Sequence, residues 1–214
     1  MKHITFYFDV ISPYAYLAFE HLPAALMGNS YSMTYQPILF AGALNHHGQL
    51  GPAEIPPKRD WTYRQILWLA RELSIPLQFP AAHPFNPLAL QRLAVAVGKF
   101  GSPSRIAVER LFHHVWRNGL EASDATRLID LIKEMSPAQD PNSPEVKAKL
   151  KANTEEAIAK GVFGVPTFEV DGKLFFGLDA LPMLASYLQN DPWFQSEEWE
   201  ICKKIPIGIA RGKN

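Results

Sequence analysis

The chain begins with the run Ile4-Thr5-Phe6-Tyr7-Phe8-Asp9-Val10-Ile11-Ser12-Pro13-Tyr14-Ala15-Tyr16, in which a strand pattern passes directly into a helix pattern. Residues 4–9 are rich in aromatic and β-branched side chains, which favours a buried strand. Ser12-Pro13 is typical of a helix start, because serine is a preferred N-cap and proline fits the first helical position. We therefore expect a strand over 4–9 and a helix from Ser12 to near Gly28.

Further strands and a further helix are expected in the N-terminal and C-terminal parts of the chain. A second strand is expected from Tyr31 to Ile38, which makes a βαβ unit with a parallel strand pair and a right-handed crossover. Further on, Phe168 to Val170 and Lys173 to Phe176 flank Asp171-Gly172, a favoured two-residue hairpin turn. Asp179 is expected to cap a last helix through Leu188.

The region between these ends is predicted to be helical. Leu39 to Pro57 is rich in Gly, Pro, His and Asn without periodicity, so we expect a long loop there. Helices are expected to follow at Asp60 to Leu73, from Asn86-Pro87, from Ser102-Pro103, at Asp124 to Met135, and from Ser143-Pro144 to Lys160. The layout is an α/β fold, βαβ then ββα, with a large all-helical insertion.

Composition narrows the class of protein. The 214 residues are 47% hydrophobic and 20% charged, which is typical of a globular chain. The 21 basic and 21 acidic residues cancel, so no charge imbalance points to nucleic acid or an anionic membrane. The single cysteine, Cys202, excludes an internal disulfide and suits a reducing compartment. Met1-Lys2-His3 enters a strand directly, and we expect a soluble cytoplasmic protein.

Ser12 is the first candidate for chemistry. Unpaired N–H groups and the helix dipole at a helix start favour a bound anion. Taken alone, a serine before proline is most often an ordinary N-cap. No Gly-x-Ser-x-Gly elbow surrounds it and no Asp/His pair is placed by the sequence, so a hydrolytic triad is unsupported. Donating a hydrogen bond to a thiolate of another molecule is a task that a serine performs without a base.

The second candidate is Val165-Pro166-Thr167, at a loop-to-strand junction. A proline here is either an ordinary trans residue at a strand start or a cis proline. In the cis form, the backbone N–H and C=O of Val165 would face outward and pair with an extended peptide.

No metal site is expected. His46-His47 and His113-His114 are adjacent pairs, and neighbouring side chains on a helix or strand point apart. Cys202 lies far from the reactive turn in sequence, and we interpret it as a bystander thiol.

The quoted segments resemble one family. The chain is similar to the DsbA-like thioredoxin superfamily, in the branch of 2-hydroxychromene-2-carboxylate isomerases and kappa-class glutathione transferases. The motifs lie in family order between residues 4 and 190: Phe6-Tyr7-Phe8-Asp9-Val10-Ile11-Ser12-Pro13-Tyr14-Ala15-Tyr16-Leu17, Pro56-Pro57-Lys58-Arg59, His83-Pro84-Phe85-Asn86-Pro87, Phe163-Gly164-Val165-Pro166-Thr167 and Phe176-Gly177-Leu178-Asp179. The resemblance implies a discontinuous thioredoxin-like domain, 1–39 and 161–214, with a helical insertion domain at 40–160.

The resemblance also implies a cofactor, glutathione, and a set of site residues. Ser12 would favour the glutathione thiolate, Val165 and Pro166 would hold the tripeptide backbone, and Asp179 would take its α-amino end. Lys58 would approach cofactor carboxylates, and the implied substrate contacts are Tyr14, Arg59 and Asn86. For Asn86, a role as a helix N-cap is as good an explanation as a contact with the substrate. Ala180 stands where many family members carry arginine after the aspartate, so a charged contact to glutathione is expected to be missing.

The implied activity is a glutathione-dependent cis-trans isomerisation of an aromatic-derived keto acid, as in aromatic catabolism. A thiolate that adds to a carbon conjugated with a carbonyl makes the C=C bond single, so rotation and loss of the thiol deliver the isomer. The alternatives are a kappa-type glutathione transferase and a non-catalytic DsbA-like binding module. A homodimer is expected from the family resemblance alone.

Overall fold

A computed structural model describes residues 1–98 and 100–209. Four strands form one sheet in the order β2-β1-β3-β4, namely β1 (Lys2–Phe8), β2 (Tyr31–Pro37), β3 (Thr167–Val170) and β4 (Lys173–Phe176). The pairing is parallel between β1 and β2 and antiparallel for β1 with β3 and for β3 with β4. The predicted βαβ unit and the predicted hairpin are therefore confirmed.

The central strand β1 is buried on both faces. Ile4, Phe6 and Phe8 point into the larger hydrophobic cluster, whereas Tyr7 belongs to a smaller cluster on the other face. This alternation is the two-residue period of a strand. The rings of Phe6 and Phe168 stack with centroids 4.8 Å apart, which joins β1 to β3.

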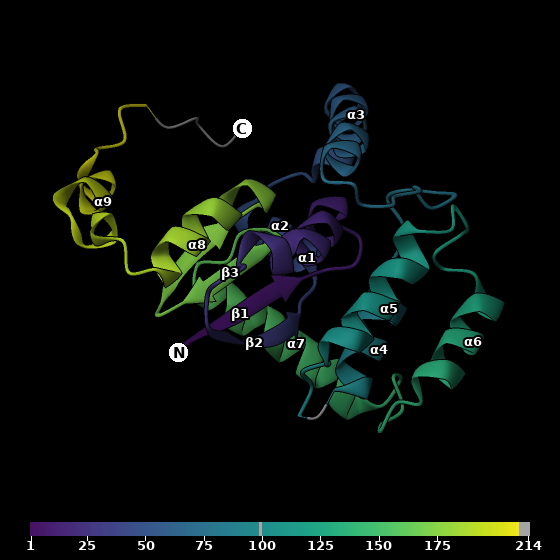
Figure 1. Cartoon of the computed structure of the whole chain (residues 1–214). Helices are drawn as coiled ribbons and strands as arrows, with labels where there is room; N and C mark the ends of the chain where they lie inside the picture. The colour runs from purple at the N-terminus through teal and green to yellow at the C-terminus, as the bar shows by residue number, and fades with distance from the viewer. Residues whose placement is uncertain (99, 210–214) are drawn as a thin grey trace.

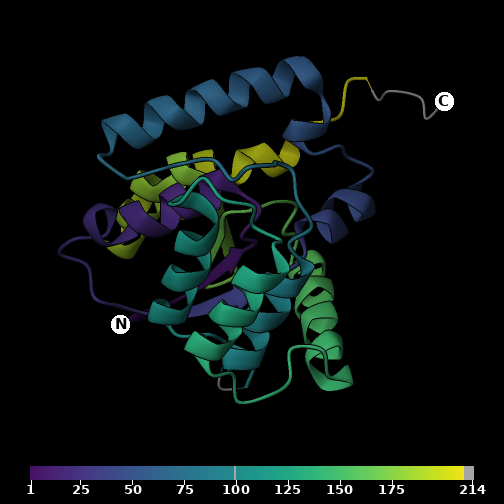
Figure 2. The same ribbon diagram turned by 90° about the vertical axis from the view of Figure 1, so that its right-hand side faces the viewer.

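Helices cover both faces of the sheet. In Figure 1, α1 (Pro13–Ala25) and α8 (Leu181–Leu188) lie together on one face, while α7 (Pro144–Ala159) packs against β2 from the other. Figure 2 shows α3 (Pro56–Glu72) as a long helix across one end of the molecule. The remaining α-helices among the described residues are α2 (Phe40–His47), α4 (Leu88–Val97), α5 (Arg105–Trp116), α6 (Ala125–Met135) and α9 (Glu197–Ile201).

The expectation of a long loop over Leu39 to Pro57 is wrong. The segment folds as α2, followed by a short 3-10 turn at Pro52–Glu54. Two side chains that are distant in sequence accept hydrogen bonds from backbone N–H groups at the start of α2. The Asp9 carboxylate accepts the N–H of Phe40 at 2.9 Å, and Thr154 Oγ1 accepts the N–H of Leu39 at 3.0 Å. Because both partners are remote in sequence, no local pattern indicated this helix.

Most predicted helix starts were confirmed, but the helix expected from Asp60 begins at Pro56. Asp124 and Ser143 cap α6 and α7 as expected, and Asn86 Oδ1 accepts the N–H of Leu88 at the start of α4. The start at Ser102 is wrong, because Ser104 Oγ caps α5 through the N–H of Ala107.

The sequence predicted that Asp179 caps α8, and this prediction is wrong. It lies within a 3-10 turn, Leu178–Ala180, and α8 begins at Leu181 without a side-chain cap.

The helical insertion shares its core with the sheet. Gln91 of α4 is fully buried and donates hydrogen bonds to the carbonyls of Phe8 (3.0 Å) and Ile38 (2.7 Å). Phe112 and Trp116 of α5 belong to the same hydrophobic cluster as Phe8 of β1. The insertion and the sheet therefore contact each other through a common interior.

The C-terminal segment beyond α8 folds as a 3-10 turn, Pro192–Gln195, then α9 and a second 3-10 turn, Cys202–Lys204. Phe194 is buried against Phe175 and Tyr187, which attaches this segment to the sheet. The predicted tail extends to Asn214, and its last five residues lie outside the described part. Among the described residues, no helix has the length and apolar character needed to cross a bilayer.

Candidate functional site

Ser12 lies at the junction of β1 and α1, where its side chain serves both elements. It is buried and is the N-cap of α1, with Oγ accepting the N–H of Ala15 at 3.2 Å. The same hydroxyl donates to the backbone carbonyl of Val165 at 3.3 Å. Since the usual O–H···O distance is about 2.7–2.8 Å, this second bond is long. The hydroxyl proton is therefore weakly held and available to a stronger acceptor.

The Val165-Pro166 element lies directly beside Ser12, although 153 residues separate them. The peptide bond between Val165 and Pro166 is cis, one of the two alternatives that the sequence left open. The carbonyl of Pro166 accepts the N–H of Gly177 at 2.9 Å, which ties the element to the segment after β4. Among the described residues, none accepts a hydrogen bond from the amide of Val165. This amide is thus free to bind an extended ligand.

Asp179 lies next to the same element. Gly177 has a φ of +100°, and a methyl group added there would overlap the Asp179 carboxylate. The carboxylate therefore folds back over Gly177, close to Pro166 through the Gly177–Pro166 hydrogen bond. Its charge also contributes to Tyr14: burial, and secondly the Asp179 charge, raise the pKa of the Tyr14 phenol.

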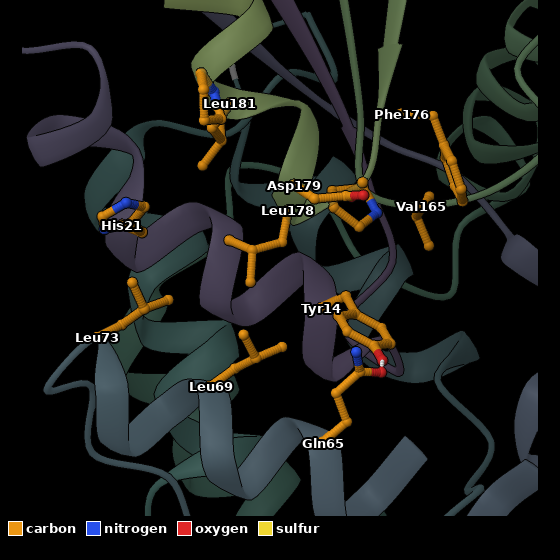
Figure 3. A pocket seen from close by; sticks show the side chains of 13 residues that line it. Tyr14, His21, Gln65, Leu69, Leu73, Val165, Phe176, Leu178, Asp179 and Leu181 are labelled. Atoms are coloured by element: carbon orange, nitrogen blue, oxygen red, sulfur yellow. Dashed lines mark hydrogen bonds between the residues drawn. The ribbon is translucent and has the colours of Figure 1, made fainter. Parts of the chain in front are cut away.

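These residues border a cleft of about 480 Å³ between α1, α3 and the start of α8. Figure 3 shows Tyr14 pointing to Gln65 of α3, and the Tyr14 hydroxyl donates to Gln65 Oε1 at 2.6 Å. The lining is mainly apolar and consists of Tyr14, His21, Gln65, Leu69, Leu73, Val165, Pro166, Phe176, Gly177, Leu178, Asp179, Leu181 and Pro182. The arrangement suits a ligand with an apolar body and a few polar groups.

The structure brings together five of the predicted site residues and leaves three apart. Tyr14, Val165, Pro166 and Asp179 line the cleft, and Ser12 lies behind this lining, bonded to the carbonyl of Val165. Lys58, Arg59 and Asn86 are not part of its lining.

Lys58 nevertheless lies on the side of α3 that carries Gln65 and Leu69, since positions seven and eleven residues apart on a helix share one face. Arg59 lies near Tyr63, whose raised pKa its charge opposes. Asn86 is exposed, and its Oδ1 accepts the N–H of Leu88 at the start of α4.

Three other aromatic residues, Tyr16, Trp61 and Phe85, do not line the cleft. Tyr16 is fully buried in the core, where its hydroxyl donates to the carbonyl of Pro76 at 2.5 Å. Phe85 is buried against the His83 ring, and Trp61 is 64% exposed outside the cleft. The sequence missed the α3 wall, Gln65, Leu69 and Leu73, although their spacing of four residues is the helical signal for a shared face.

The turn before Ser12 is fixed by the helical insertion. Trp116 Nε1 donates to the carbonyl of Val10 at 2.9 Å, and His83 Nε2 lies 2.9 Å from the carbonyl of Ile11. A carbonyl only accepts, so His83 carries its proton on Nε2, and Nδ1 accepts from the Tyr63 hydroxyl at 2.6 Å. Burial lowers the pKa of His83, which keeps the ring neutral. These bonds hold the reactive turn in place.

Asp9 is a buried acid three residues before Ser12. Its carboxylate accepts the N–H groups of Ile11 (3.1 Å) and Phe40 (2.9 Å), and burial raises its pKa to about 7 against these bonds. Asp9 belongs to the first motif of the family resemblance, which implies no role for it. Its position between two helix starts, α1 and α2, makes it a structural support of the site.

One cluster of possible metal ligands occurs among the described residues. Glu20 of α1 and Glu109 and His113 of α5 have ligand atoms within 4.8 Å of one another. The spacing of four between Glu109 and His113 is the signal that the sequence analysis overlooked. The Glu20 carboxylate already contacts Arg117 at 3.2 Å and His113 at 2.7 Å. Its negative charge is therefore balanced by these side chains of the protein.

Known proteins resemble the chain over most of its length. A 2-hydroxychromene-2-carboxylate isomerase of Sphingobium xenophagum is 29% identical over 194 residues, which cover 87% of this chain and 98% of that protein. Glutathione S-transferase kappa 2 of Caenorhabditis elegans is 29% identical over 207 residues, which cover 87% and 92%.

Solved structures share the fold. The structure of a 2-hydroxychromene-2-carboxylate isomerase matches with a TM-score of 0.77 at 24% identity, covering 92% of this chain and 98% of that one. The cytosolic disulfide reductase DsbM of Pseudomonas aeruginosa, solved with GSH, matches with a TM-score of 0.53 at 15% identity, covering 94% and 99%. The predicted thioredoxin-like fold is thereby confirmed.

The family itself follows from a match over residues 3–189 to the model of the DSBA-like thioredoxin domain. That range contains β1 to β4, the reactive turn at Ser12 and the Val165-Pro166 element. The chain is a member of the DsbA-like thioredoxin family that carries serine at its reactive turn.

Proposed function

We propose that the protein is a glutathione-dependent isomerase of the 2-hydroxychromene-2-carboxylate type. The observation that carries the proposal is the Ser12 hydroxyl, held at the start of α1 beside Val165 at the edge of an apolar cleft. The isomerase and kappa-class transferase relatives support a glutathione-linked enzyme. The match to a solved structure with GSH supports the same cofactor.

Glutathione, when bound, supplies a thiolate that adds to the conjugated carbon of the substrate and later leaves it. Ser12 would direct its hydroxyl proton at this sulfur instead of the Val165 carbonyl. That exchange is favourable because a hydrogen bond to a charged acceptor is stronger than the long bond to a neutral carbonyl. The N-terminal N–H groups of α1 favour the negative charge as well.

The other residues would bind and orient. The Val165 amide would pair with the cofactor backbone beside Pro166, Asp179 with its amino group, and Lys58 with a carboxylate. Tyr14 would contact the substrate from the floor of the cleft, with Arg59 and Asn86 at greater distance. The substrate would be a small aromatic keto acid. The homodimer remains a prediction from the family resemblance, and the cytoplasmic location remains a prediction from the sequence.

A kappa-type transferase is the second candidate, favoured by the relative from Caenorhabditis elegans. The two activities differ in the fate of the thiol. An isomerase changes the ultraviolet spectrum of a chromene-type substrate with catalytic glutathione, whereas a transferase consumes glutathione stoichiometrically.

The test compares wild type with Ser12→Ala and a matched control, Ser104→Ala. Each variant loses an N-cap, which costs about 1 kcal/mol of stability. Ser12→Ala should also lose at least about 100-fold in turnover, the scale of one lost transition-state donor, whereas Ser104→Ala should keep wild-type turnover. Equal turnover in both variants would contradict the proposal. Absence of a thermal shift with glutathione would instead favour the non-catalytic binding module.

A further inference from the structure

The loop between α3 and α4 carries a histidine that the proposed reaction leaves without a role. His83, the first residue of the motif His83-Pro84-Phe85-Asn86-Pro87, is half-buried, and its Nε2 donates to the carbonyl of Ile11 at 2.9 Å. Ile11 immediately precedes Ser12 in the chain. This contact therefore links the loop to the peptide bond that enters the reactive turn.

That peptide bond is held at both of its polar atoms. A peptide unit is planar, so the carbonyl of Ile11 and the N–H of Ser12 can only rotate together. The carbonyl accepts from His83, and the N–H donates to the backbone carbonyl of Asp9 at 3.1 Å. The two bonds restrict the plane to one orientation, which sets where the Cα and Cβ of Ser12 lie.

His83 is in turn oriented by Tyr63 of α3. The Tyr63 hydroxyl lies 2.6 Å from Nδ1 of His83 and 2.9 Å from the backbone carbonyl of the same residue. The imidazole thus has a hydrogen-bond partner at each nitrogen. Its orientation is therefore fixed between α3 and the reactive turn.

The two acceptors near the Tyr63 hydroxyl let the pair take up a proton without releasing the turn. While His83 is neutral, Tyr63 donates to Nδ1. When Nδ1 is protonated, it donates to the Tyr63 oxygen, and the Tyr63 proton turns to the carbonyl of His83. Nε2 keeps its proton in both states, so the bond to Ile11 is kept.

Two charged groups act close to this pair. Arg59 of α3 opposes the rise in the pKa of Tyr63 that burial causes. Asp9 lies in the reactive turn itself, and burial raises its pKa to about 7. The remaining rings packed around His83 do not titrate, and they are Phe79, Phe85 and Trp116.

We propose that His83 and Tyr63 are positioning residues of the reaction: they hold the peptide unit that enters Ser12 and so aim its hydroxyl at the sulfur of the bound thiol. His83 acts through its Nε2 proton and neither gives nor takes a proton during turnover. The inference rests on the proposed function and adds the residues that orient its hydroxyl donor.

Two replacements of His83 separate this role from packing. Glutamine places its amide nitrogen where Nε2 lies, so His83→Gln keeps the donor to Ile11, whereas the shorter asparagine reaches only the position of Nδ1. Both variants lose the ring. The kcat of His83→Asn should fall about 10- to 100-fold below that of His83→Gln, the scale of a misplaced catalytic group, at equal Kd for glutathione. Equal kcat in both, or a difference in Kd alone, would overturn the inference.

The part played by Tyr63 is tested by nitrogen-15 NMR of the histidine rings. Tyr63→Phe should shift the Nδ1 signal of His83 and lower kcat, because Nδ1 loses its donor. Tyr31→Phe is the control, since the Tyr31 hydroxyl makes no hydrogen bond within the described part of the chain, and it should change neither. An unchanged Nδ1 signal in Tyr63→Phe would refute the pairing.

The pH dependence of kcat tests the protonation argument. Wild type and His83→Gln both keep Asp9, so their profiles should have the same shape. An inflection that is present in wild type and missing in His83→Gln would show that His83 exchanges a proton during turnover, contrary to the inference.

Amide hydrogen exchange of the ligand-free chain keeps the two proposals apart. The N–H groups of Ser12 and Ala15, both bonded within the turn, should exchange at the wild-type rate in His83→Gln and faster in His83→Asn. If they do, and wild type shows no turnover with glutathione, the proposed function is wrong and the fixed turn stands. If exchange is equal in the two variants, the inference is wrong, whatever the activity.

Discussion

Asp9 shows how one buried side chain links the stability of the protein to pH. Its pKa is about 7 in the folded protein because burial opposes ionisation, whereas an unfolded aspartate titrates near 3.9. Between these values the folded state holds one more proton than the unfolded state. This contribution to stability is therefore present at low pH and is lost as pH rises toward 7, by up to about 1.4 kcal/mol per pH unit.

The variant Asp9→Asn should flatten the decline of unfolding free energy between pH 5 and 7, since the group no longer titrates. Urea titrations at half-unit steps of pH measure the slope. Asp130→Asn, at an exposed position of α6, is the matched control and should keep the wild-type slope. A wild-type slope in Asp9→Asn would show that the carboxyl does not carry the effect.

Gly177 is a single residue on which the position of the Asp179 carboxylate depends. Alanine at this φ of +100° is strained, and its methyl group would displace the Asp179 carboxylate. Gly172, with a φ of +75° and open space around it, is the natural comparison.

Both Gly177→Ala and Gly172→Ala should lose about 1 kcal/mol or more in stability through backbone strain. Only Gly177→Ala should also weaken glutathione binding, because only there does the carboxylate move. Thermal unfolding and calorimetry measure the two effects. Equal glutathione affinity in the two variants would show that Asp179 does not contribute to glutathione binding.

At the scale of elements, local patterns predicted most of the helices and strands but not their remote partners. Ser143-Pro144 and Asp171-Gly172 carry their own turn and cap chemistry, so the start of α7 and the hairpin were found. The helix α2 was missed because its first N–H groups are satisfied by Asp9 and Thr154, which are distant in sequence.

The site was predicted unevenly for a related reason. Ser12 was singled out by a helix-start pattern and Val165 by an X-Pro junction, whereas Asp179 was assigned to the site only by the family resemblance. The α3 wall was not predicted as part of the site, because only the tertiary packing of α3 against α1 brings Gln65 to Tyr14. The role of each residue toward a ligand remains a prediction.

At the scale of the molecule, the common core of sheet and insertion predicts cooperative unfolding. Trp116 lies in the insertion and Phe8 in the sheet, yet both belong to one hydrophobic cluster. Far-ultraviolet circular dichroism and tryptophan fluorescence should therefore give coincident urea transitions. Two separated transitions would show that residues 40–160 unfold as a domain of their own.

Gln91 connects these two parts by hydrogen bonds. Gln91→Leu leaves the buried carbonyls of Phe8 and Ile38 without their side-chain donor, so it should cost about 2–4 kcal/mol of unfolding free energy. The exposed Gln189→Leu serves as control and should change stability by less than about 0.5 kcal/mol. A similar small change in Gln91→Leu would mean that the bridge is unimportant.

The placement of sulfur in this molecule has a consequence for oxidative stress. The chain has one cysteine, Cys202, which is exposed on the C-terminal segment, while the reactive turn carries a serine. An oxidant therefore cannot inactivate the turn by converting a protein thiol there to a sulfenic or sulfinic acid. Oxidation of cysteine falls instead on Cys202, whose sulfenic acid condenses with a second thiol to a disulfide and water, and reduction of that disulfide restores the thiol.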